Sequence, residues 1–337
     1  MGVKGIDHIE WYVDDLEKSV AVLRHDFGFH VADPGPDRGP GCRSILLRQR
    51  QISLLLTAAV AAGHPAADFV RRHGDGVATI AFRTDDVRAA FEMAVAGGAE
   101  PIAAPASGTA VVSGFGDVTH RLVERADAAP VPADDGEGLL TTLDHVAVCL
   151  PAGQLDETVR FYGDAFGLRQ VFDERIEVSG QAMLSKVMQD QTGTVTFTLI
   201  EPDPALKPGQ IDEFLSAHGG AGVQHLALRT EDIVAAVRTL AGRGVGFLTA
   251  PPGYYHTLLA RLGVTGRPVS QLEELNVLAD RDRWGDLFQV FTRSTHKRHT
   301  FFLELIERQG ARTFGSRNIR ALYEALGAEH PSMTLLT

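Results

Sequence analysis

The sequence predicts an α+β protein of two domains, each assembled from paired modules with the order βαβββ, and a further helix at the C-terminus. The first reason is an internal repeat: HGDGVATIAFRTDDVRAAFEMAVAGGAE, from His73, reappears as HGGAGVQHLALRTEDIVAAVRTLAGRGVG, from His218. The second is that each copy passes from the two-residue period of a strand to the longer period of a helix. The third is a stretch at 126–138 that is rich in Ala, Pro, Asp and Gly, as linkers are. We therefore expect domains at 1–128 and 140–337, joined by a linker at 129–139.

Each half opens with an alternating strand and then a helix. The strands are IDHIEWYV, from Ile6, and LDHVAVCL, from Leu143. Apolar residues at helical spacing place the helices within 14–29 and 153–168, each with a glycine just past its last turn.

The rest of each half continues the module pattern. The expected segments are β-rich runs at 44–57 and 193–202, strand–helix units at 83–98 and 229–244, and closing strands in GDVTHRLVER and HTFFLELIER. Thr84 and Thr230 are expected to cap the second helix of each half, and Ser316 the terminal helix.

The composition is typical of a globular protein rather than of a nucleic-acid-binding or membrane protein. Of the 337 residues, 44% are hydrophobic and 22% charged. The net charge of −11, with no basic cluster, argues against a nucleic-acid partner. No window approaches the roughly 20 apolar residues that span a bilayer, and the start of the chain lacks a signal stretch. Cys42 and Cys149 match no disulfide or ligand spacing, so we expect a cytoplasmic protein with free thiols, and a homo-oligomer is compatible with this composition.

Alignment of the two halves indicates a metal site in the second half only. The aligned pairs are His8 with His145, Thr79 with His225, and Arg121 with Glu304. A cation cannot be held by His, Thr and Arg, whereas two His and one Glu can hold it. Strand alternation allows the three candidates to converge inside a curved sheet.

Two imidazoles and a carboxylate that leave neighbouring positions open form the facial triad of non-haem Fe(II) oxygenases. Zinc is chemically possible, but the HExxH helix of many zinc hydrolases is missing. A lone strand histidine is more often structural, and Glu304 in the apolar FFLELIER could instead pair with an arginine. The changed positions in the first half favour the metal interpretation, and His8 is expected to be structural.

These residues resemble the 4-hydroxyphenylpyruvate dioxygenase family of the vicinal oxygen chelate superfamily. The resemblance covers essentially the whole chain and rests on the modules, on the ligand spacing, and on GGAGVQHLAL, FLELIERQGARTFGS and NIRALYEAL. It implies curved mixed-sheet half-barrels with helices outside, a metal-free first domain, and Fe(II) held by His145, His225 and Glu304. It further implies 4-hydroxyphenylpyruvate and O2 as substrates. The family divides between ring hydroxylation, which gives homogentisate, and benzylic hydroxylation, which gives 4-hydroxymandelate.

Three departures from the dioxygenase pattern resemble the branch that forms 4-hydroxymandelate. The dioxygenases usually carry Pro and Asn where this chain has Thr198 and Ile200, and a Phe where it has Ile319. That Phe would stack on the substrate ring, so smaller side chains leave the ring room to present its benzylic carbon. Ordinary sequence drift among core residues, such as that between Phe and Ile, would explain the same changes. The expected reaction is oxidative decarboxylation with benzylic hydroxylation, to 4-hydroxymandelate and CO2; homogentisate formation is the alternative. The resemblance also suggests a role in peptide-antibiotic biosynthesis.

Other pocket positions follow from the same resemblance. They are Ser185, Gln210, Gln224, Gln289 and Phe291. A hydroxyl and amides suit a phenol or a carboxylate, and the aromatic suits a ring, although Phe291 could equally be core. Strict alternation would put Gln224 on the strand face opposite to His225. The terminal helix is expected to close over the site.

Similar duplicated modules also occur in other classes of protein. These are metal-dependent isomerases, extradiol ring-cleaving dioxygenases and metal-free drug-sequestering proteins. A sequestering protein would have no use for the triad, so metal uptake separates it from the enzymes.

Overall fold

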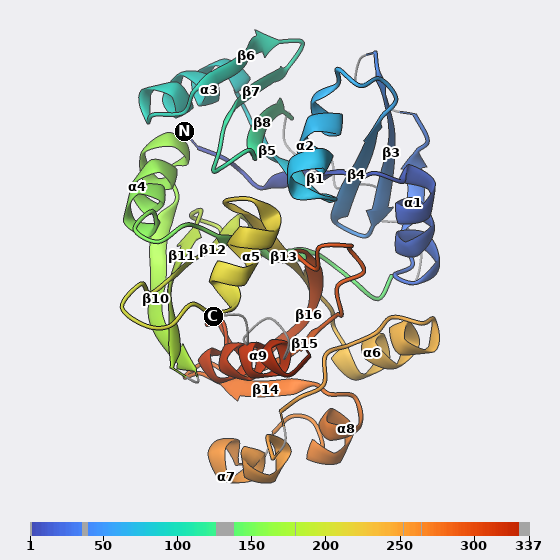
Figure 1. The fold of residues 1–337 in the computed structure, drawn as a ribbon, viewed down its shortest axis with the longest axis vertical. Helices are drawn as coiled ribbons and strands as arrows, with labels where there is room; N and C mark the ends of the chain where they lie inside the picture. The colour runs from blue at the N-terminus through green and yellow to red at the C-terminus, as the bar shows by residue number, and fades with distance from the viewer. Residues whose placement is uncertain are drawn as a thin grey trace.

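The computed structural model describes residues 2–35, 40–125, 138–178, 180–251, 253–263 and 265–329. Two eight-stranded mixed sheets dominate it, one from each half of the chain (Figure 1). The first half comprises β1 (Ile6–Tyr12), α1 (Leu16–His25), β2 (His30–Asp33), β3 (Cys42–Gln49), β4 (Ile52–Ala59), α2 (Pro65–His73), β5 (Gly76–Thr84), α3 (Val87–Ala96), β6 (Pro101–Ala106), β7 (Thr109–Ser113) and β8 (Thr119–Glu124).

The second half repeats this order with additions. Its elements are β9 (Leu143–Cys149), α4 (Leu155–Phe166), β10 (Arg169–Val178), β11 (Gln181–Gln189), β12 (Thr196–Pro202), α5 (Gln210–His218), β13 (Gly222–Arg229), α6 (Ile233–Gly242), the 3₁₀ turn η1 (Tyr255–Thr257), α7 (Leu258–Leu262), α8 (Val269–Glu274), β14 (Leu278–Arg281), β15 (Asp286–Phe291), β16 (Phe302–Gln309) and α9 (Ser316–Glu329).

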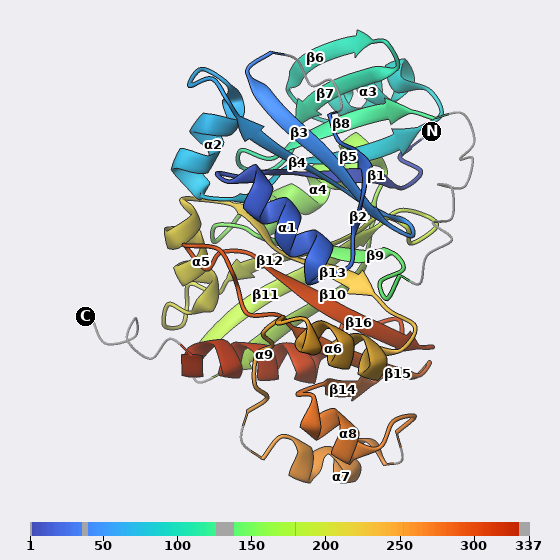
Figure 2. The same ribbon diagram turned by 90° about the vertical axis from the view of Figure 1, so that its right-hand side faces the viewer.

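The two sheets have the same topology. Their strand orders are β2-β3-β4-β1-β5-β8-β7-β6 and β10-β11-β12-β9-β13-β16-β15-β14. In each, the first strand runs antiparallel to the first strand of the second module, while the last strand of each module returns parallel to its first. Each sheet curls into a half-barrel (Figures 1 and 2). The predicted α+β fold of paired βαβββ modules is confirmed.

Alternation divides the second sheet into an outer and an inner face. Outward residues such as Val146, Val148 and Leu226 join the main core, which includes α4 and α6. Inward residues such as Ala147 and Ile200 form a separate cluster with α5 and α9. The inner face is therefore covered by two helices, whereas α4 and α6 lie outside as expected.

Two additions distinguish the second half. The excursion 243–277, which carries η1, α7 and α8, separates α6 from β14, while in the first half α3 leads almost directly into β6. The other addition is α9, which lies beside β10 and β14. Figure 2 shows α7 and α8 at the end of the molecule farthest from the first sheet. The sequence did not predict the excursion.

The expected caps were wrong in detail. The caps of α3 and α6 are Asp86 and Asp232, whose carboxylates accept backbone N–H bonds from the first turn. Thr84 and Thr230 instead accept from the backbone N–H of these aspartates.

The start of the terminal helix differs from the expectation, and the expected linker is not tested. Ser316 is the first residue of α9 rather than the residue before it, and Asp280 accepts from the backbone N–H of Arg317. The linker expected at 129–139 lies almost wholly outside the described residues, so the domain boundaries stay a prediction. Cys42 and Cys149 form no disulfide within the described residues. None of the described helices has the length and apolar character needed to cross a membrane.

Candidate metal centre

Strand register brings the three predicted ligands onto the inner face of the second sheet. His145 on β9 stands beside Ala227 on β13, which stands beside Glu304 on β16. In the next row, His225 on β13 stands beside Ala147 on β9. The ligands therefore occupy adjacent rows of three neighbouring strands, and the curl of the sheet turns their side chains toward one point.

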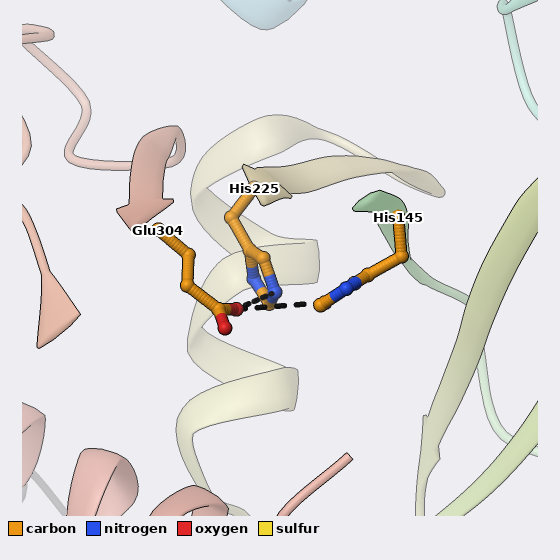
Figure 3. A group of neighbouring side chains, drawn as sticks. All are labelled: His145, His225 and Glu304. Carbon is orange, nitrogen blue, oxygen red and sulfur yellow. Dashed lines mark ion pairs between the residues drawn. The ribbon is translucent and has the colours of Figure 1, made fainter. Parts of the chain in front are cut away.

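The three side chains form a compact, buried group (Figure 3). Nε2 of His145 and Nε2 of His225 each lie 3.4 Å from Oε2 of Glu304. One potential ligand atom from each residue lies within 4.8 Å of the other two. Glu304 is paired with the two histidines, so the alternative of an arginine salt bridge is wrong. Two imidazole nitrogens and a carboxylate oxygen that converge in this way fit a divalent cation.

Charge interactions inside the site are strong because all three groups are buried. Burial raises the pKa of Glu304, but the two neighbouring histidines outweigh it and hold that pKa below its ordinary value. Burial lowers the pKa of His145, but Glu304 and Asp144 outweigh it and raise that pKa. For His225 burial wins, and its pKa is lowered. A cation that binds here must compete with protons for Nε2 of both histidines, because a coordinating imidazole is neutral.

The second ring nitrogen of each histidine is held by its chain neighbour. Nδ1 of His145 lies 3.0 Å from Oδ1 of Asp144, and Arg308 binds the same carboxylate through two N–H groups at 2.8 Å each. Nδ1 of His225 lies 3.2 Å from Oε1 of Gln224. These bonds leave Nε2 of both rings free to face the centre.

The first half keeps the orienting groups without the ligands. His8 stands beside Ala81 and then Arg121, in the register of His145, Ala227 and Glu304. Nδ1 of His8 bonds Asp7, which Arg125 binds in turn. Thr79 occupies the place of His225 and bonds Thr119. The structure thus places Thr79 and Arg121 where the sequence alignment put them.

The predicted pocket residues on β11, β12 and α9 meet at one inner surface. Ser185 stands opposite Ile200 in the antiparallel pair, and Thr198 lies two residues away on the same face. Ile200 belongs to the inner cluster, and Ile319 on α9 packs against that cluster. Oγ1 of Thr198 is buried and has no hydrogen-bond partner among the described groups.

Gln224 reaches the site through an irregularity of its strand. The register between β13 and β9 shifts between Val223 and His225, so Gln224 is an extra, bulged residue. It is buried beside His225, with Oε1 3.2 Å from Nδ1 of that histidine. Strict alternation was the wrong guide here, because a bulge puts two successive side chains toward the same side.

The remaining predicted residues lie at different distances from the centre. Nε2 of Gln289 donates to Oε1 of Glu304 at 2.7 Å. Phe291 is buried, with its ring 6.2 Å from that of His225. Gln210 begins α5 and lines a small cavity with Tyr323 and Met183.

Sequence reasoning missed several residues around the site. Tyr323 joins the inner cluster, Asn318 donates to Gln289 at 2.8 Å, and the Phe314 ring lies 5.2 Å edge-on to that of His145. Ile319 and Tyr323 are four residues apart on α9, so helical spacing could have indicated Tyr323 once Ile319 was chosen. Phe314 lies in the stretch FLELIERQGARTFGS that carries the family resemblance, but outside the assigned helices and strands, so periodicity could not indicate it.

Comparison with known proteins gives a family for this arrangement. The model of the Glyoxalase/Bleomycin resistance protein/Dioxygenase superfamily matches residues 5–112 and 142–290. A structure of a triple mutant of 4-hydroxymandelate synthase from Streptomyces coelicolor is 46% identical, with a TM-score of 0.90, and the match covers 98% of this chain and 100% of that one.

Two fungal proteins are similar in sequence along nearly the whole length. One is 4-hydroxyphenylpyruvate dioxygenase of Yarrowia lipolytica, 30% identical over 97% of this chain and 92% of its own. The other is probable 4-hydroxyphenylpyruvate dioxygenase 2 of Aspergillus fumigatus, 32% identical over 96% of this chain and 93% of its own. With the duplicated modules and the His-His-Glu centre, these matches show that the chain belongs to the 4-hydroxyphenylpyruvate dioxygenase family of the vicinal oxygen chelate superfamily.

Proposed function

We propose that this protein binds Fe(II) and converts 4-hydroxyphenylpyruvate and O2 into 4-hydroxymandelate and CO2. The observation that carries the proposal is the buried His-His-Glu centre beside an inner surface that has Ile200 and Ile319 at the two positions expected to steer the ring. The 46% identity to a 4-hydroxymandelate synthase, against 30–32% to the fungal dioxygenases, supports the benzylic product.

The metal would be held by His145, His225 and Glu304. Bound Fe(II) would supply positions where an α-keto acid can chelate and O2 can bind. The orienting bonds from Asp144 and Gln224 keep both imidazoles presenting Nε2 to the metal. The remaining chemistry assigned to the protein is placement of the substrate and exclusion of water.

The inner surface offers matched contacts for a phenolic keto acid. A buried hydroxyl without a partner costs free energy, so the Oγ1 of Thr198 is suited to pair with a polar group of the substrate. Ser185 lies on the same face of the sheet. Ile200 and Ile319 supply apolar surface of modest size, which leaves the ring free to turn.

Two helices shield this surface from water. Ile211 and Phe214 of α5 and Tyr323 of α9 are buried against the inner cluster. A closed, apolar site strengthens the electrostatic interactions in it and protects reactive species from solvent. We assign α9 the role of a lid on this basis.

Product analysis tests the proposal. The purified protein is loaded anaerobically with Fe(II), mixed with 4-hydroxyphenylpyruvate and exposed to O2, and the product is identified by mass and chiral chromatography. We expect 4-hydroxymandelate with one mole of CO2 released. Homogentisate would establish the dioxygenase alternative instead, and failure to take up any metal would favour a metal-free binding protein. A cytoplasmic location remains a prediction from composition.

A further inference from the structure

A chain of hydrogen bonds runs from the backbone of β14 to the candidate metal ligand Glu304. The backbone N–H of Ala279 donates to Oη of Tyr254 at 2.9 Å, and this hydroxyl donates to Oδ1 of Asn318 at 2.7 Å. Nδ2 of Asn318 then donates to Oε1 of Gln289 at 2.8 Å, and Nε2 of Gln289 donates to Oε1 of Glu304 at 2.7 Å.

The direction of this chain is fixed by its two ends. A backbone N–H can only donate and an ionised carboxylate can only accept, so every link between Ala279 and Glu304 donates toward the carboxylate. Oη of Tyr254 also lies 2.9 Å from the carbonyl of Ala279, but its contact with Asn318 is shorter. Asn318, Gln289 and Glu304 are all buried. Hydrogen bonds that all point in one direction in a buried environment strengthen one another.

The chain makes the two oxygens of Glu304 unequal. Oε1 accepts the bond from Gln289, whereas Oε2 lies 3.4 Å from Nε2 of both histidines. A carboxylate held in this way presents Oε2 alone to a cation. Six-coordinate iron would then keep three open positions, and a carboxylate bound through both oxygens would leave only two. A chelating keto acid and O2 together need three.

The chain also joins the two additions that distinguish the second half. Tyr254 belongs to the excursion 243–277, and Asn318 belongs to α9. In the first half the position of Glu304 is occupied by Arg121, and α3 leads to β6 without an excursion. The additions therefore occur in the half that has the ligand set, and they meet at its carboxylate.

We infer that Asn318 and Tyr254 are positioning residues: acting through Gln289, they hold Glu304 so that it binds metal through one oxygen, and they couple the seating of α9 to metal binding. The inference rests on the metal site of the proposed function. Because coupling between two sites is reciprocal, bound metal stabilises seated α9 as much as seated α9 strengthens metal binding.

Two variants and two matched controls test this inference. Tyr254→Phe removes one hydroxyl from the chain, and Asn318→Ala removes its central link. Tyr255→Phe removes a neighbouring buried hydroxyl that donates to the backbone carbonyl of Val277 at 3.1 Å, and Arg320→Ala changes an exposed residue of α9. The readouts are the dissociation constant for Co(II), measured without substrate, and hydrogen exchange of the α9 backbone with and without Co(II).

We expect the wild-type protein and both controls to bind Co(II) alike and to show slower α9 exchange when it is bound. Tyr254→Phe and Asn318→Ala should weaken Co(II) binding by about 10- to 100-fold, as loss of a group that orients a ligand does. They should also lose the metal-dependent protection of α9.

Each contrary result has a separate meaning. Wild-type protein that binds no Co(II) overturns the metal site itself. Wild-type protein that binds it while Tyr254→Phe matches Tyr255→Phe in both readouts overturns the inference and leaves the metal site standing. Weaker binding with unchanged α9 protection overturns the coupling. Circular dichroism checks folding, and if Asn318→Ala does not fold, Tyr254→Phe decides the question alone.

Discussion

Histidine orientation is shared by both halves, whereas metal-binding capacity is not. Asp144 and Arg308 fix His145 in the second half, and Asp7 and Arg125 fix His8 in the same way in the first. An oriented imidazole is therefore not sufficient for a metal centre. The decisive difference is that Thr79 and Arg121 replace the other two ligands, and an arginine charge opposes any cation.

Removal of any one ligand should abolish metal binding and turnover. We expect His145→Ala, His225→Ala and Glu304→Ala each to lose iron, because the two remaining groups are too few to hold it. Metal content by elemental analysis and product formation provide the check. His8→Ala is the control and should keep both; an iron-loaded, fully active Glu304→Ala protein would refute the assignment.

Asp144→Asn should weaken metal binding by about 10- to 100-fold, since the ring of His145 loses its anionic acceptor. Asp7→Asn makes the same change in the same setting beside His8, so it should leave metal affinity unaltered. Titration of both variants with Co(II) compares them directly. Equal losses in the two would show a general effect on the fold rather than an effect on the ligand.

Ile319→Phe should shift part of the product from 4-hydroxymandelate toward homogentisate. A phenyl group at this position of α9 would pack toward the inner cluster and restrict the substrate ring. The product ratio, measured by chromatography after complete conversion, is the readout. An unchanged ratio with intact activity would mean that the aliphatic side chain does not steer the reaction.

The helices α1, α3 and α6 each start at an aspartate cap, and the sequence around such a start leaves the capping residue ambiguous. In α3, Asp86 caps the helix while Thr84 bonds the backbone of Asp86. The segment Arg83–Val87 contains Thr and Asp in succession, and each is a good cap by residue type. Only the backbone conformation selects between them.

Asp86→Ala should lower the free energy of unfolding by about 0.5–2 kcal/mol, the usual effect of losing an N-cap. Asp85→Ala, one residue earlier, removes only an exposed ion pair with Lys4 and should cost less than about 1 kcal/mol. Urea denaturation of the two variants distinguishes them. If Asp85→Ala were the more damaging, the capping assignment would be wrong.

The two half-barrels are joined by a buried, mainly aromatic interface. Gly97 approaches the backbone of Ala165 on α4 so closely that a Cβ atom would lie 2.4 Å from its nitrogen. His120 of β8 accepts a bond from the hydroxyl of Tyr162 at 2.7 Å and stacks on Phe82. The first half, although it lacks the ligand set, therefore buries one flank of the half that has it.

This interface should make stability sensitive to acid. Burial lowers the pKa of His120 from its ordinary 6.5 to about 3. At pH values between these two pKa values, His120 binds a proton in the unfolded chain but not in the folded protein. The free energy of unfolding therefore falls as the pH falls, by up to about 1.4 kcal/mol per pH unit.

The double variant His120→Phe/Tyr162→Phe removes both polar partners and keeps the ring shapes. We expect it to be nearly as stable as the wild type at pH 7, whereas Tyr162→Phe alone should cost about 1–3 kcal/mol because the buried Nε2 of His120 is left without its partner. Urea denaturation at pH 7 and pH 5 should show a smaller acid loss in the double variant. An identical loss would place the acid sensitivity elsewhere.

Local pattern and internal repetition were enough to predict much of this protein. The modules, the three ligands and the degenerate positions Thr79 and Arg121 follow from comparing the two halves, because duplicated segments keep the same register. Gln224 was named as a pocket position from the family resemblance, but alternation put it on the face opposite to His225, since a bulge that alternation cannot show lies there. Tyr254 was missed because it lies in an excursion that has no counterpart in the first half.

The amino-acid sequence alone determined which residues are able to hold a metal and on which strands they lie, because periodicity and repetition can be read from the order of residues along the chain. Only the folded chain decided how those residues are oriented. The bond from Gln289 to Glu304, its continuation through Asn318 to Tyr254, and the cover formed by α5 and α9 join segments far apart in the sequence. Such contacts depend on the curl of the sheet and on the packing of helices against it, and no local pattern encodes them.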